Sequence, residues 1–136
     1  MTRPYQNIEV RPDGDVSCVC IRQRRLDEAA IHAVGTELLQ LIDQDGCRRM
    51  VLSLGPGSLE CLYSIFMAKL VSVQRRIQDR QGALVLCDVT PDVVTVFEAC
   101  RLRTFFEFAP DRAAAVEAIR KKPFESRPGD QPGGTP

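Results

Sequence analysis

The feature that most constrains the fold of this chain is a regular alternation between short apolar runs and longer segments with helical periodicity. Residues 16–21, 49–54 and 83–87 are short runs rich in Val, Leu, Ile and Cys, typical of strands that are covered on at least one face. Between these runs, apolar residues recur three or four positions apart, as in amphipathic helices. Strands that alternate with helices favour a largely parallel sheet with right-handed crossovers, so the sequence predicts an α/β domain.

Turn and cap residues set the limits of the predicted elements. Residues 7–11 form a strand that ends at the turn Pro12-Asp13-Gly14 and pairs as a hairpin with the next strand, and residues 105–108 form a last short strand. The predicted helices run from an Asp27 cap to a stop at Gly46, over residues 63–80 to the stop Gln81-Gly82, from a Thr90-Pro91 start to Cys100, and from residue 110 or 111 to about residue 121. This order predicts a mixed sheet of about four to five strands with helices packed mainly on one face.

The size and charge of the chain favour one domain and argue against a nucleic-acid partner. With 136 residues, of which 44% are hydrophobic, the chain has room for a single core. Its 18 acidic residues balance its 18 basic residues, whereas a protein that neutralises phosphate backbones needs a basic excess. No segment has the apolar length of a membrane span or the pattern of a secretory signal. We therefore expect a cytoplasmic protein without direct membrane insertion.

The C-terminal residues 123–136 differ from the rest of the chain in composition. Pro, Gly, Ser, Asp and Gln dominate them, and Phe124 is their only large apolar residue. Such a segment cannot bury enough apolar surface to repay the entropy lost on ordering. We expect one domain over residues 5–122 and a disordered tail over residues 123–136.

The cysteines of the chain point to reduced thiols rather than to disulfides or a metal site. The six are Cys18, Cys20, Cys47, Cys61, Cys87 and Cys100. Because an export signal is lacking and most of them lie in apolar runs, we expect them to be reduced and mostly buried. Only Cys18 and Cys20 form a close pair, on one face of a strand, and no second pair completes a zinc tetrahedron. We expect no metal and no other cofactor.

The sequence offers no catalytic constellation. The single histidine, His32, lies within a predicted amphipathic helix without a matching nucleophile. The stretch Gly55-Pro56-Gly57 lacks the Lys-Ser/Thr that follows the glycines of a phosphate-binding loop, so it is interpreted as a turn. The acidic residues are scattered over predicted solvent faces. We therefore expect a protein that is not an enzyme, and a thiol-redox activity is the weakest of the function classes considered.

Three stretches of the chain resemble the STAS domain of anti-sigma-factor antagonists. Residues 50–62 resemble the family's buried strand and regulatory loop, and residues 78–87 resemble its helix end, glycine stop and next strand. Residues 90–108 are the most specific stretch, because they are similar to the run S/T-P-x-V-x-x-x-F/L followed by G-L-x-x-x-F. With the hairpin and first helix, the resemblance covers about residues 7–120 and implies a STAS-like mixed sheet in a regulatory protein.

The resemblance also implies a phosphorylation site. In the family, a segment Asp-Ser-Ser/Thr-Gly-Leu-Gly starts the helix after the regulatory loop, and its first Ser is the phosphoacceptor for a histidine-kinase-like serine kinase. Residues 63–68 fall on this segment, so Ser64 occupies the phosphoacceptor position. The chain departs from the family pattern at Tyr63, Ile65, Phe66 and Ala68, and again at Arg101, which replaces the glycine before Leu102. A plain helix cap is the alternative role for Ser64.

The candidate partner-binding residues are Cys61, Tyr63, Ser64 and Met67, because the resemblance places them at the loop and helix start that the family uses for its partner. They bring apolar and polarisable groups to that position. Phe66 is expected instead in a core stripe with Leu70, Val73 and Ile77.

Two functions follow from the resemblance. The first is partner switching in transcription regulation and signal transduction, in which the chain binds an anti-sigma factor or histidine-kinase-like serine kinase and releases it when Ser64 is phosphorylated. The alternative is a STAS domain without phosphorylation that serves as a docking or scaffold module of a sensory or transporter complex, or that self-associates.

Overall fold

The computed structural model describes residues 5–55, 57 and 59–122. The elements follow one another in the order β1 (Ile8–Asp13), β2 (Val16–Ile21), β3 (Arg25–Leu26), α1 (Glu28–Asp43), β4 (Arg49–Ser53), β5 (Glu60–Cys61), α2 (Tyr63–Asp79), β6 (Ala83–Cys87), α3 (Pro91–Ala99), β7 (Glu107–Ala109) and α4 (Arg112–Arg120).

The main sheet is mixed and has five strands in the order β1-β2-β4-β6-β7. The hairpin pair β1 and β2 is antiparallel, and the other neighbours are parallel. Val51 in the central strand β4 lies between Cys18 of β2 and Val85 of β6. The short strands β3 and β5 form a second, parallel pair. The prediction of a mixed α/β sheet is confirmed.

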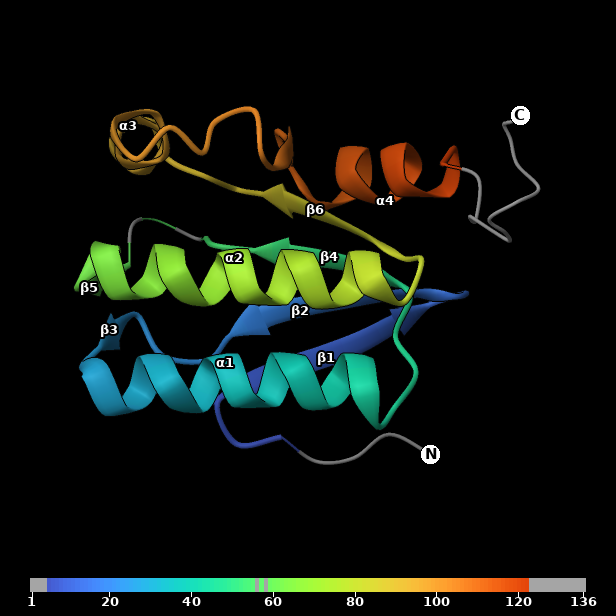
Figure 1. The fold of residues 1–136 in the computed structure, drawn as a ribbon. Helices are drawn as coiled ribbons and strands as arrows, with labels where there is room; N and C mark the ends of the chain where they lie inside the picture. The colour runs from blue at the N-terminus through green and yellow to red at the C-terminus, as the bar shows by residue number, and fades with distance from the viewer. Residues whose placement is uncertain (1–4, 56, 58, 123–136) are drawn as a thin grey trace.

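Helices cover the two faces of this sheet unequally. Alternate residues of a strand point to opposite faces, so Leu52 and Val51 belong to different buried clusters. The larger cluster joins Leu52 to α1, α2 and the buried residues of α3, whereas the smaller joins Val51 to α4. Figure 1 shows α1 and α2 side by side along the sheet, with α3 and α4 above β6 in this view. Most helices therefore serve one core, as the sequence predicts.

Capping residues explain where several helices begin. Asp27 accepts a hydrogen bond from the Ala30 amide at 2.8 Å, and Asp111 accepts one from the Ala114 amide at 2.9 Å. Thr90 is the N-cap of α3 and Pro91 its first residue, as predicted, but the Thr90 hydroxyl bonds the Asp92 carboxylate at 2.5 Å instead of a helix amide. Gly46 follows α1 with a φ of 75°, which suits a residue without a Cβ.

Two details differ from the prediction. The last strand is Glu107–Ala109 rather than residues 105–108, because Phe105 closes a turn to the Leu102 carbonyl and Phe106 is buried against Phe97. The short strands β3 and β5 were not predicted, since two residues are too few to show a period.

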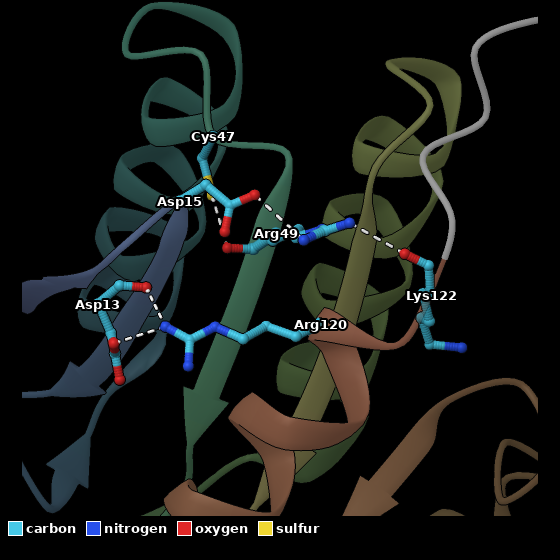
Figure 2. A network of polar contacts seen from close by, with 6 residues as sticks. All are labelled: Asp13, Asp15, Cys47, Arg49, Arg120 and Lys122. Carbon is cyan, nitrogen blue, oxygen red and sulfur yellow. Dashed lines mark hydrogen bonds and ion pairs between the residues drawn. The ribbon is translucent and has the colours of Figure 1, made fainter.

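A polar network ties the start of β4 and the end of α4 to the hairpin turn (Figure 2). Arg120 donates to the Asp13 carbonyl at 3.0 Å and to its carboxylate at 2.6 Å. Arg49 donates to the Asp15 carboxylate at 3.1 Å and to the Lys122 carbonyl at 2.9 Å. These hydrogen bonds reinforce the packing of α4 and of the chain up to Lys122 against the sheet. The predicted tail, including Phe124, lies outside the described residues.

The helices in the described part of the chain are each too short or too polar to cross a membrane.

Candidate functional site

The connection between β4 and β5 leads to Ser64, and the side chain of Arg24, the residue just before β3, bonds it at three points. Arg24 donates from Nη2 to the Leu54 carbonyl at 2.6 Å and to the Gly57 carbonyl at 3.1 Å, and from Nη1 to the Gly55 carbonyl at 3.0 Å. The Arg24 carbonyl also accepts a hydrogen bond from the Glu60 amide at 2.7 Å. Main chain and side chain of Arg24 therefore both fix the path toward α2.

A second contact fixes the start of the same connection. The Ser53 hydroxyl donates to the Asp88 carboxylate at 2.6 Å and accepts from the Gly55 amide at 3.3 Å. Ser53 is the last residue of β4, and Asp88 directly follows β6. Because β4 and β6 are adjacent parallel strands, the two side chains meet at the same edge of the sheet. This pair was not predicted from the sequence. The signal that could have indicated it is a polar residue near the end of each of two apolar runs.

The helix α2 begins without a polar cap. Its N-cap is Leu62, whose carbonyl accepts from the amides of Ile65 and Phe66 at 3.1 and 3.0 Å and whose side chain cannot accept a hydrogen bond. Ser64 is the second residue of the helix, so the plain-cap role considered for it is wrong. It is exposed, and the first turn holds no acidic residue. The first turn therefore carries no carboxylate of its own to offset the positive end of the helix.

The predicted partner-binding residues do not share one environment. Cys61 and Tyr63 are half-buried and Ser64 is exposed, whereas Met67 is only 3% exposed and belongs to the core. Met67 therefore presents no side chain to a partner in this structure, in contrast to its proposed place at an interface. Leu62, which the sequence analysis did not single out, has 56% of its surface exposed and is the only large apolar residue so exposed among those described.

The aromatic ring of Tyr63 is turned back toward the connection. Its hydroxyl donates to the Leu59 carbonyl at 2.5 Å, and its ring packs edge-on against Phe66 with centroids 6.4 Å apart. Burial raises the pKa of the Tyr63 hydroxyl, Cys61 and Asp92 add to the rise, and the positive charge of Arg24 opposes it. The predicted core stripe is confirmed, since each of its members is 1% exposed or less: Phe66, Leu70, Val73 and Ile77.

The cysteines are all free, but only three of the six are buried. Cys18, Cys47 and Cys87 are buried, Cys20 and Cys61 are intermediate, and Cys100 is exposed, so the expectation that most are buried was too broad. Burial raises the pKa of Cys61 to about 11 and that of Cys87 to about 12, which keeps both thiols protonated and weakly nucleophilic near neutral pH. Within the described residues, no three metal-ligating side chains gather at one point.

Similarity to a curated sequence decides the family. The chain is 31% identical over 106 residues to the anti-sigma factor antagonist BtrV of Bordetella bronchiseptica, a match that covers 78% of this chain and 89% of BtrV. This chain belongs to the anti-sigma-factor antagonist family of STAS-domain proteins. The family consists of regulators rather than enzymes. No family model matches the sequence.

Solved STAS structures share the fold of this family member. A STAS-domain protein of Planctomyces limnophilus matches with a TM-score of 0.72 at 21% identity, over 84% of this chain and 98% of that protein. Unphosphorylated SpoIIAA matches with a TM-score of 0.65 at 13% identity, over 85% and 99% of the two chains. Phosphorylated SpoIIAA from Bacillus matches with a TM-score of 0.63 at 15% identity, over 83% and 99% of the two chains. The family and fold inferred from the sequence are both confirmed.

Proposed function

We propose that this antagonist binds an anti-sigma factor or a histidine-kinase-like serine kinase in the cytoplasm through the start of α2, and that a phosphate on Ser64 releases the partner. The observation that carries the proposal is an exposed Ser64 next to the exposed Leu62, at a helix start that no polar side chain caps. We call Cys61, Leu62, Tyr63 and Ser64 the docking surface. An apolar group surrounded by partly polar neighbours suits a specific protein contact.

The surroundings of Ser64 can accommodate a phosphate group. A phosphoserine carries about two negative charges at neutral pH, and these are favourable beside the free amides of a helix N-terminus. The first turn contains no acidic residue, and the carboxylate that acts on the adjacent Tyr63 is that of Asp92, on α3. Tyr63 replaces the family's Asp, and Phe66 replaces a Gly. Both leave Ser64 accessible, because Phe66 is buried and the Tyr63 hydroxyl is bonded to the Leu59 carbonyl. The name of one structural neighbour, phosphorylated SpoIIAA, records phosphorylation of that protein.

The first prediction separates a phosphoswitch from a structural role of Ser64. Ser64→Asp places a negative charge on the docking surface and should weaken partner binding by about tenfold or more. Ser64→Ala should bind like wild type. Both variants should keep the free energy of unfolding within about 0.5 kcal/mol of wild type, because Ser64 is exposed and is not the cap. Titration calorimetry against purified histidine-kinase-like serine kinase domains of the source organism, with thermal melts, measures both.

A second candidate function is a constitutive docking or self-associating module. It is favoured by one observation, the replacement of the family's acidic residue before the phosphoacceptor by Tyr63. In this case the kinase domain would transfer no phosphate to Ser64, and wild type, Ser64→Asp and Ser64→Ala would bind a partner equally. Mass spectrometry after incubation with kinase and ATP, together with the three affinities, distinguishes the two functions.

A further inference from the structure

The guanidinium of Arg24 lies at the centre of the contacts that shape the connection before the docking surface. We propose that Arg24 is a positioning residue: by binding three carbonyls of the β4–β5 connection, it holds the docking surface in the conformation that a protein partner recognises. The role rests on the proposed function, since it concerns the same surface, but Arg24 is not one of the four residues of the docking surface that we assign to the partner.

The geometry suits an arginine and no other side chain. The three acceptors are carbonyls of Leu54, Gly55 and Gly57, which lie 30 to 33 residues further along the chain than Arg24. A guanidinium offers five N–H donors in a rigid planar fork, so it can hold several carbonyls at fixed positions. A lysine ammonium is a single point with a flexible stem and cannot reproduce this spread of contacts.

Loss of Arg24 would force the connection to change its path. Leu54 and Gly55 are buried, whereas Gly57 is exposed. Without the guanidinium their carbonyls lose the charged donor, and a buried acceptor left unpaired is costly. Arg24 Nε is itself buried without a hydrogen-bond partner among the described residues. The hydrogen bonds of the Arg24 side chain to this connection are therefore made by its two Nη atoms.

Three further contacts link this part of the chain to the docking surface. The Arg24 carbonyl binds the Glu60 amide, and β3 pairs with β5 in the register Leu26 to Cys61. At the other side, the Tyr63 hydroxyl binds the Leu59 carbonyl. Leu62 follows β5 directly and is the N-cap of α2. The exposure of Leu62 and Ser64 therefore depends on a connection that Arg24 holds at one end and Tyr63 at the other.

The neighbouring Arg25 provides a matched control. It carries the same charge, but its side chain is 86% exposed and pairs at 3.0 Å with Glu60, whose side chain is 69% exposed. An exposed pair of this kind contributes little to stability. Arg25→Ala therefore removes a positive charge next to the docking surface without removing any contact to the three carbonyls.

The experiment compares Arg24→Ala, Arg24→Lys and Arg25→Ala in the full chain by amide hydrogen exchange without a partner. We expect exchange in peptides spanning residues 54–62 to be about tenfold faster or more in both Arg24 variants, and unchanged in Arg25→Ala and in the peptides of α1. Equal exchange in the Arg24 and Arg25 variants would overturn the positioning role, as would faster exchange throughout the molecule, which would mark Arg24 as a general stabilising residue.

Binding to the purified kinase domains completes the test. Both Arg24 variants should bind about tenfold more weakly or worse while Arg25→Ala binds nearly as wild type. Faster exchange with unchanged affinity would overturn the link between the connection and the partner. If wild type binds no kinase domain, the proposed function fails, whereas the exchange data still decide whether Arg24 holds the connection. Should Arg24→Ala fail to fold, Arg24→Lys, which keeps the charge and the stem, gives the same comparison.

Discussion

Replacement of Phe97 by alanine should lower the free energy of unfolding by about 3–5 kcal/mol. Phe97 is fully buried, and its ring packs edge-on against Phe106 and Phe108 with centroids 5.5 and 5.0 Å away. The helix that carries it, α3, has nine residues and buries only Val93 besides Phe97. Truncation therefore leaves a large cavity and also removes the main anchor of a short helix.

Urea denaturation followed by circular dichroism measures this loss, with Glu98→Ala as the control. Glu98 is the next residue of the same helix and is exposed, so its replacement should change the free energy of unfolding by no more than about 0.5 kcal/mol. A loss below about 1.5 kcal/mol for Phe97→Ala would mean that α3 does not depend on this aromatic cluster.

Replacement of Gly82 by alanine should lower the free energy of unfolding by about 3 kcal/mol, at the upper end of the usual cost of overpacking. A Cβ at this position would lie 2.3 Å from the Arg48 carbonyl oxygen and 2.9 Å from Cγ1 of Ile77. The backbone cannot easily move away, because the Gly82 amide binds the Ile77 carbonyl and the Ala83 amide binds that same Arg48 carbonyl, each at 2.8 Å. The clash thus acts on the first pairing of β4 with β6.

Gly46→Ala is the matched control for this substitution. Gly46 has a φ of 75° but nothing within 4 Å of an added Cβ, so alanine there incurs only backbone strain of roughly 1–2 kcal/mol. Thermal and chemical unfolding of the two variants should place Gly82→Ala clearly below Gly46→Ala in stability. The reverse order would show that the contact between Gly82 and Arg48 can relax.

Elements with a clear period were predictable from the sequence, and elements without one were not. The helix α1 shows its apolar face at Ile31, Val34 and Leu38 and its cap at Asp27, all of which the structure retains. The strands β3 and β5 have two residues each and form only because distant main-chain groups meet, such as the Glu60 amide and the Arg24 carbonyl. Contacts of this kind leave no local pattern in the sequence.

The candidate site was predictable in position but not in detail. The resemblance put Ser64 at the start of a helix, where the structure has it, but the N-cap is Leu62, which carries none of the usual cap signals. Met67 was predicted to lie at an interface. The buried face of α2 is wider than the predicted core stripe, because it also includes Met67 and Gln74. The role of Arg24 could not be predicted from the sequence, because its three acceptors are main-chain carbonyls 30 to 33 residues further along the chain.

The most direct test of partner binding through the start of α2 is a substitution of its exposed apolar residue. Leu62→Asp should weaken binding of the unphosphorylated chain to its kinase domain by about tenfold or more in titration calorimetry, since an apolar contact near the centre of an interface is replaced by a charge.

Ser72→Asp is the control, because Ser72 is exposed on the same helix, eight positions beyond Ser64. Among the purified histidine-kinase-like serine kinase domains, at least one should bind wild type and Ser72→Asp with the same Kd and bind Leu62→Asp much more weakly. Equal affinity for all three proteins, or no binding of wild type to any of these domains, would contradict partner binding through this surface.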